Sequence, residues 1–229
     1  MQPNYQVLTR STAIGVSQQK VLRNTYLLLA LSLIPTAIGA FVGVNLSFAF
    51  MAMSPIVSGL LFLAVVYGLF FAIEKNKDSG LGVLLLLGLT FFLGVMLGPI
   101  MQVALGLKNG QQLIALAAGG TATVFFTMAG IATVTRKDFS FMANFLMVGV
   151  IVAMIAVIAN LFLQIPAMGL AISALFILLC SALILFQVSQ VIHGGETNYI
   201  TATLSLYMSI YNIFVSLLNL LMAFSGQRD

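Results

Sequence analysis

The chain has 229 residues, of which 61% are hydrophobic and 6% charged. A typical soluble domain carries about 25% charged residues, so this composition excludes an ordinary water-soluble fold. The formal net charge of +4 comes from nine basic and five acidic residues. The bases lie between apolar runs, where they orient membrane helices and contact lipid headgroups, so they do not indicate nucleic-acid binding. A crossing needs about 20 residues, which allows about seven crossings and leaves no room for a soluble catalytic domain.

The two ends of the chain differ in character from its middle. Residues 1–20 are rich in Gln, Ser and Thr and contain no acidic residue. Such a segment has little apolar surface to bury and does not pack by itself. We therefore predict a flexible cytoplasmic N-terminal tail over residues 1–20, a transmembrane domain over residues 21–225 and a polar C-terminal stub over residues 226–229.

Seven apolar runs of about membrane-spanning length follow one another along the chain. Charged or turn-forming residues separate them, as in segments 74–78, 136–138 and 164–166. The pattern predicts an all-α membrane protein, a bundle of seven transmembrane helices. A six-span arrangement, with one weak segment re-entrant, stays open. The predicted spans are residues 21–44, 54–73, 81–105, 112–135, 139–163, 167–192 and 199–224.

The basic residues predict which side of the membrane each loop occupies, because cytoplasmic loops carry the excess of Lys and Arg. With the N-terminus in the cytoplasm, seven of the nine bases lie inside and only Lys108 and Arg228 lie outside. Seven spans then place the C-terminus on the far side. The bases on the inside are Arg10, Lys20, Arg23, Lys75, Lys77, Arg136 and Lys137.

No Asp, Glu, Lys, Arg or His lies well inside any of the seven runs. Charged groups at the membrane centre are costly and are kept mainly for ion pathways, proton relays or catalysis. The single histidine cannot supply a zinc motif, and no serine has a histidine base at membrane depth. Cys180 is the only cysteine, which excludes an intrachain disulfide and a paired-cysteine metal site. We expect neither an enzyme nor a cofactor or metal site.

Neutral polar residues in the last two runs form the candidate polar cavity. Gln187 and Gln190 are three residues apart on one helical face, as are Ser209 and Asn212 on the next. In lipid, such groups usually form hydrogen bonds between helices and so act in packing. Two polar faces on neighbouring helices can also line a cavity.

Glycine pairs predict close helix contacts at two places. Gly39 and Gly43, and likewise Gly94 and Gly98, are four residues apart, the spacing that lets helix backbones approach in membranes. The pattern is common and specifies no function.

The segment from His193 to Glu196 contains the candidate pH-sensitive residues. Gly194 suits a left-handed conformation at the end of a helix, and His193 lies where the helix dipole favours a bound proton. Glu196 precedes the last helix and is first of all a partner of its dipole. A role of His193 and Glu196 in sensing pH is the functional alternative to this structural interpretation.

Residues 186–218, FQVSQVIHGGETNYITATLSLYMSIYNIFVSLL, resemble the last two helices of the Bax inhibitor-1 family. Similar short matches are KVLRNTY at 20–26, LGPI at 97–100, TRKDFSF at 135–141 and NLFLQIPA at 160–167. The resemblance is close to the bacterial YccA branch of the family and covers nearly all of the chain after residue 20.

This resemblance implies a seven-helix bundle in a bacterial inner membrane. It also implies association with the membrane-anchored protease FtsH, as an inhibitor or slowly processed substrate in membrane protein quality control. Alternatively, other family members are pH-dependent calcium leak channels gated by two facing aspartates, whose positions correspond to Gln187 and Ser209. Neutral groups cannot share a titrating proton, so that gate is absent. A structural or stress-response membrane protein is the third alternative.

Overall fold

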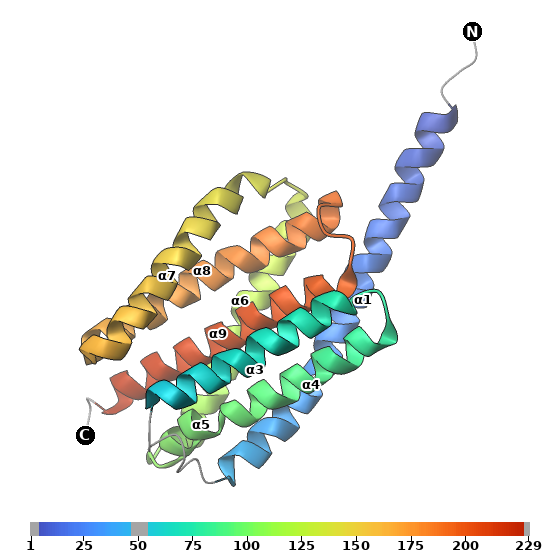
Figure 1. Cartoon of the computed structure of the whole chain (residues 1–229). Helices are drawn as coiled ribbons and strands as arrows, with labels where there is room; N and C mark the ends of the chain where they lie inside the picture. Colours follow the sequence, from blue (N-terminus) through green and yellow to red (C-terminus); the bar gives the residue numbers. More distant parts are fainter. Residues whose placement is uncertain (1–4, 47–54, 227–229) are drawn as a thin grey trace.

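The computed structural model describes residues 5–46 and 55–226, and all regular elements in these ranges are helices (Figure 1). The all-α prediction is therefore confirmed for this part of the chain. In order, the helices are α1 (Tyr5–Val44), α3 (Pro55–Lys75), α4 (Gly80–Met96), α5 (Gly98–Leu105), α6 (Gly110–Thr135), the 3-10 helix η1 (Ser140–Met142), α7 (Ala143–Leu163), α8 (Pro166–His193) and α9 (Tyr199–Gly226).

Six helical segments of the described residues are long and apolar enough to cross a membrane. They agree with six of the seven predicted spans. The remaining predicted span, 54–73, coincides with α3, which has 21 residues, except that Ser54 lies outside the described residues. The C-terminal stub also lies outside them after Gly226. The six segments are Val16–Val44, Gly80–Leu105, Gly110–Thr135, Ser140–Leu163, Pro166–His193 and Tyr199–Gly226.

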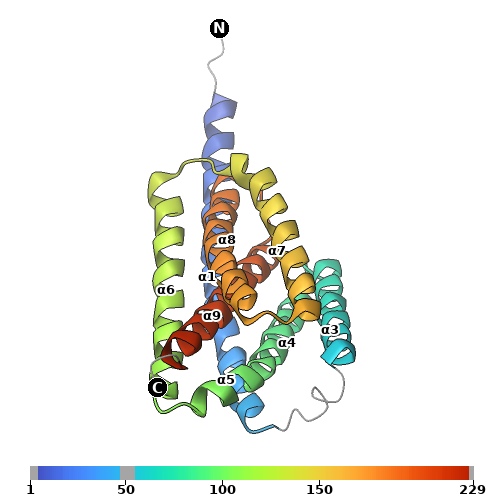
Figure 2. The ribbon, with the colours of Figure 1, turned by 90° about the vertical axis from the view of Figure 1, so that its left-hand side faces the viewer.

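The first helix begins earlier than predicted. We expected helix from near Val21 and a flexible tail before it, but α1 begins at Tyr5, so residues 5–20 are helical. The segment contains no proline between Tyr5 and Lys20 that would end a helix. Once the membrane span has formed the first turns, extending the helix is easier than starting it. In Figures 1 and 2 this N-terminal part of α1 projects beyond the other helices.

The third predicted span is two helices rather than one. The break lies at Leu97, between α4 and α5, where Pro99 is in the first turn of α5. Proline lacks an N–H donor and its ring clashes with the preceding turn, so a helix cannot continue through it undisturbed. The Leu97 N–H instead donates to the carbonyl oxygens of Leu93 at 3.2 Å and Gly94 at 3.0 Å.

Helix α9 lies at the centre of the bundle and packs against α1, α4, α5, α6 and α8. Figure 2 shows α3 and α7 at the periphery, where α3 packs on α4 and α7 packs on α8. The largest cluster of buried side chains surrounds Tyr207 of α9, which is 1% exposed. Its hydroxyl lies 2.8 Å from Thr36 Oγ1 of α1 and donates to the Thr90 carbonyl oxygen of α4 at 3.4 Å. One side chain thus joins three helices.

Glycines allow the close approach of α1 and α4. A Cβ atom built on Gly39 would overlap the Phe91 carbonyl oxygen, and one on Gly43 would overlap that of Val95. On the opposite side of the contact, a Cβ atom on Gly94 would overlap the Thr36 carbonyl oxygen. The close contact predicted for Gly39, Gly43 and Gly94 is therefore present, and the obstacle to a larger residue is backbone that cannot rotate away.

We expect Gly94→Ala to lower the stability of the protein by about 1–3 kcal/mol, because the added methyl group must separate α1 from α4. The midpoint of thermal unfolding in detergent micelles measures this loss. Gly88→Ala is the matched control, since it lies on the same helix and no atom is within 4 Å of its added Cβ. Equal midpoints for the two variants would contradict the packing explanation.

Candidate functional site

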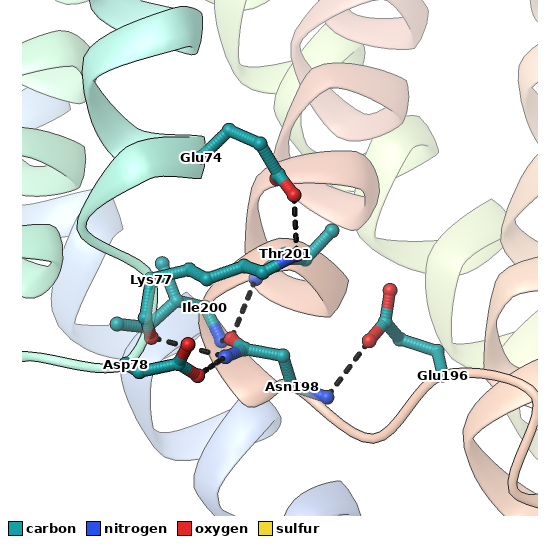
Figure 3. A network of polar contacts seen from close by, with 7 residues as sticks. All are labelled: Glu74, Lys77, Asp78, Glu196, Asn198, Ile200 and Thr201. Carbon is teal, nitrogen blue, oxygen red and sulfur yellow. Dashed lines mark hydrogen bonds and ion pairs between the residues drawn. The ribbon is translucent and has the colours of Figure 1, made fainter.

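A network around Asn198 joins the loops at one end of the bundle (Figure 3). The Asn198 amide nitrogen donates to the Lys77 carbonyl oxygen at 3.0 Å and to Asp78 Oδ1 at 2.9 Å. The amide oxygen accepts from the N–H groups of Ile200 at 2.9 Å and Thr201 at 3.3 Å. The first N–H groups of a helix have no partner within it. Asn198 therefore caps α9 and also holds it to the loop between α3 and α4.

Glu196, one of the two candidate pH-sensitive residues, belongs to this network. Its Oε1 accepts from the Asn198 N–H at 2.7 Å, so it helps to position the residue that caps α9. Its predicted partnership with the helix dipole stays a prediction. Lys77 forms an ion pair with Glu74 (Figure 3), and their hydrogen bond raises the pKa of Lys77. Because exposed ion pairs contribute little to stability, the Asn198 contacts are the main connection here.

His193, the other candidate, ends α8 and contacts the loop between α6 and α7. Its Nδ1 lies 2.9 Å from the Ser189 carbonyl oxygen, and its Nε2 lies 3.1 Å from that of Arg136. The Ser189 hydroxyl donates to the Lys137 carbonyl oxygen at 3.2 Å and accepts from the Phe139 N–H at 3.0 Å. These contacts hold the loop after α6 against the last turn of α8.

The end of α8 is also tied to α1. Gly194 has φ +78°, the left-handed conformation that the sequence predicted for it. In the amide orientation that satisfies both partners, Gln18 of α1 donates to the Ile192 carbonyl oxygen at 2.9 Å and accepts from the Gly194 N–H at 3.2 Å. We call residues 18, 77–78, 136–140 and 189–198 together the polar corner, because hydrogen bonds link them at one end of the bundle.

Gln190 lies in the polar corner and not in the predicted cavity. Its Nε2 donates to Ser140 Oγ at 2.9 Å. Ser140 in turn donates to Asp138 Oδ1 from its hydroxyl at 2.5 Å and from its N–H at 2.8 Å. These two hydrogen bonds stabilise the carboxylate and hold the pKa of Asp138 below its usual value.

The other three predicted residues, Gln187, Ser209 and Asn212, line one cavity of about 270 Å³ between α7, α8 and α9. Ser209 donates to the Ser205 carbonyl oxygen at 3.1 Å, and Asn212 donates to that of Met208 at 2.8 Å. Both bonds stay within α9. The cavity is therefore walled in part by neutral polar groups, and the residues lining it include no carboxylate that could attract a cation.

A larger apolar groove of about 860 Å³ runs between α1, α6 and α9. Its lining includes Leu33, Ala37, Ala122 and Phe126 and, at its floor, Tyr207. The lining is mainly apolar, with a few tyrosine and threonine hydroxyls, and such a surface is compatible with lipid.

The described part of the chain shows no group of three or more His, Cys, Asp or Glu side chains that could hold a metal ion. Cys180 is buried and reduced in α8. Neither observation points to catalytic chemistry.

Sequence reasoning missed Asn198, Gln18 and Ser140 as parts of the site. For Asn198 a signal was available, because Asn directly before the start of a helix is a typical N-cap. For Gln18, and for the contact of Ser140 with Gln190, none was available, because these partners lie far apart in the chain, as the Gln190 to Ser140 bond illustrates. Only the packing of the helices brings them together.

Fold and site together define a polytopic α-helical membrane protein with a polar corner at one end and a small neutral cavity inside. Residues 18–226 match the sequence profile of the family described as "Inhibitor of apoptosis-promoting Bax1". The chain belongs to this family, the Bax inhibitor-1 family.

Relatives support the bacterial branch of the family. The chain is 48% identical over 206 residues to the Escherichia coli K12 protein named "Modulator of FtsH protease YccA", covering 90% of this chain and 91% of the relative. The same identity and coverage hold for the "Inner membrane protein YccA" of Escherichia coli O6:H1. An uncharacterized protein of Neisseria meningitidis is 46% identical over 218 residues, 94% of this chain and 96% of the relative.

Two substitutions at Asn198 separate its two roles. We expect Asn198→Ala to lower stability by about 0.5–2 kcal/mol through loss of the helix cap. Asn198→Asp keeps an oxygen that can cap α9 but replaces the donor to Lys77 and Asp78 with a second negative charge. Hydrogen exchange should therefore rise in residues 76–79 for both variants, but in residues 200–201 for Asn198→Ala only. Equal exchange in residues 76–79 of all three proteins would show that Asn198 does not hold that loop.

Proposed function

We propose that this protein is an integral inner-membrane modulator of an FtsH-type membrane protease. The observation that carries the proposal is the 48% identity, over nine tenths of the chain, to the E. coli relative named as a modulator of that protease.

The shape of the molecule supports this role. The N-terminal part of α1 projects beyond the bundle (Figure 1), so it is accessible to a partner that engages chain ends. The rest of α1 packs on α4, α5, α8 and α9. A protease that pulls on the N-terminus therefore acts directly on a helix that holds four others, and slow extraction follows from that arrangement.

The topology that we propose has seven spans, namely the six long apolar segments and, in addition, α3, and it places the N-terminus in the cytoplasm. The 21 residues of α3 meet the length that a crossing needs, about 20 residues. The end from which α1 projects also carries Lys77, Arg136 and Lys137 in its loops, as cytoplasmic loops do. On this topology the C-terminus is periplasmic and the polar corner faces the cytoplasm.

The test is the decay of a known FtsH membrane substrate in vesicles that contain the protease with and without this protein at equal stoichiometry. We expect the substrate to decay at least about twofold more slowly when the protein is present, while ATP hydrolysis by the protease continues, as for a bound competitor. Unchanged decay at this stoichiometry would eliminate the proposal.

Deletion of residues 2–14 tests whether the projecting end takes part. This variant keeps Gln18 and hence the contact between α1 and the end of α8. We expect the deletion variant to slow the decay of the FtsH substrate less than the full chain does. The matched control replaces residues 2–14 with a Gly/Ser sequence of the same length. If the deletion variant and the full chain slow the decay of the substrate equally, the projecting end has no role in modulation.

The cavity favours a second function, passage of a small solute or ion, because Gln187 and Ser209 place neutral polar groups inside the bundle. A neutral wall gives no pH-dependent gate. We expect liposomes with the native protein to show no pH-gated calcium flux, and liposomes with the Gln187→Asp, Ser209→Asp double variant to acquire it. Calcium flux of the double variant equal to that of the native protein would count against a pore at this position.

A further inference from the structure

Two helices, α1 and α6, form the walls of the large apolar groove, and α9 forms its floor with Tyr207, Tyr211 and Phe214. Both walls pack on α9, but in the described part of the chain they hardly touch each other. On the wall formed by α6, Phe126 is 70% exposed and Val134 is 83% exposed. Both walls belong to segments that are long and apolar enough to cross a membrane, so the groove opens towards lipid.

The groove has the dimensions of a lipid chain. Its wall on α1 runs from Tyr26 to Ala40, which is about 21 Å at about 1.5 Å per residue. One leaflet of the hydrocarbon core is about 15 Å thick, half of about 30 Å. Over this length, the volume of the groove corresponds to a cross-section of about 40 Å². A helix with its side chains is about 10–12 Å across, or about 80–110 Å². The groove therefore accepts an acyl chain along its length but not a whole helix.

A basic residue of α1 lies at one end of the groove. Tyr26, Ala30, Leu33 and Ala37 line the groove at intervals of three or four residues, so they share one face of α1. Arg23 lies three residues before Tyr26, on the same face, and is exposed. Side chains of a helix tilt towards its N-terminus. The guanidinium group of Arg23 is therefore directed away from the apolar lining and towards the membrane surface.

The other wall leads to basic residues at the same end. Arg136 and Lys137 directly follow α6, and the Arg136 carbonyl oxygen and Gln18 of α1 both contact the last residues of α8. Neither α1 nor α6 contains an acidic residue. The acid that follows Lys137 is Asp138, which accepts two hydrogen bonds from Ser140. This end of the groove therefore carries an excess of positive charge.

The charge of Arg23 is not neutralised within the described part of the chain. The ion pair found in residues 5–46 and 55–226 joins Lys77 to Glu74, so Arg23 has no carboxylate partner there. Guanidinium groups form strong, charge-assisted hydrogen bonds with phosphate. Basic residues at the membrane surface also attract anionic headgroups. An apolar groove that ends at an unpaired arginine thus matches both parts of an anionic phospholipid.

We propose that the groove binds an anionic phospholipid, with an acyl chain between α1 and α6 and the phosphate at Arg23. On the proposed topology this lipid belongs to the cytoplasmic leaflet. It fills the space between two helices that otherwise meet mainly through α9. The site follows from the fold and the charges, and it is independent of any action on a protease.

Quenching of tryptophan fluorescence by brominated lipids tests the site in the full chain, reconstituted in phosphatidylcholine vesicles. The chain contains no tryptophan, so a single introduced residue reports alone. Phe126→Trp places the reporter in the groove. Phe145→Trp on α7 is the matched control, because Phe126 and Phe145 are 70% and 73% exposed and Phe145 does not line the groove. Brominated phosphatidylglycerol and brominated phosphatidylcholine are compared at each position, so the depth of the reporter cancels in the ratio.

We expect the reporter in the groove to favour phosphatidylglycerol about fivefold, the effect of one basic residue at the membrane surface, and the control to show a ratio of about one. Added to Phe126→Trp, Arg23→Gln should lower the ratio to about one, whereas Arg23→Lys keeps the charge and should retain most of it. Lys75→Gln removes an exposed base outside the groove and should leave the ratio unchanged.

Equal ratios at the two reporter positions would overturn the inference. A preference for phosphatidylglycerol that survives Arg23→Gln would overturn it as well, because the phosphate would then not lie at this residue. So would weak quenching by both lipids at Phe126→Trp, since protein, for example a second copy of the chain, would then cover the groove.

Discussion

Helix ends are the points on which this structure depends, because each helix leaves backbone groups there that no turn of its own can satisfy. Side chains from elsewhere in the chain satisfy several of them. Asn198 caps the start of α9, Gln18 caps the end of α8, and at the opposite end of α1 the Gln102 amide donates to the carbonyl oxygens of Val44 at 2.8 Å and Leu46 at 2.9 Å. These same contacts set the relative positions of the helices.

The polar corner follows from that requirement. Membrane-spanning residues in lipid must satisfy their backbone within the helix, so polar side chains are freest to act where the helices end. Ser189, Gln190 and His193 lie on the last turn of α8 and bind three successive parts of the loop after α6. The corner is therefore first a structural device that holds the end of α8 to its neighbouring loops.

Hydropathy was sufficient to predict six helices long and apolar enough to cross a membrane, because about 20 consecutive apolar residues have few alternatives to a crossing helix. It failed where one residue decides the local geometry, as at the break before Pro99, and where helix continues beyond the membrane, as in α1 before Lys20.

The cavity was predicted in part for a related reason. Spacing placed Gln187 and Gln190 on one face, yet only Gln187 lines the cavity. Gln190 lies about one turn nearer the helix end, where its amide donates a hydrogen bond to Ser140, a residue far away in the chain. A helical repeat gives the face on which a residue lies, but the partner of a residue at a helix end depends on which loop packs there, and that is a property of the whole fold.

The order of contacts along α1 connects the fold with the proposed modulation of a protease. A pull on the projecting end first meets Gln18, which is bound to the end of α8. Further along α1, Thr36 is joined to Tyr207 of α9 at the centre of the bundle, and Gly39 and Gly43 then pack against the backbone of α4. Each of these contacts couples α1 to a different helix. On the proposed function, extraction of the first helix therefore has to break contacts with Tyr207 in the core of the bundle.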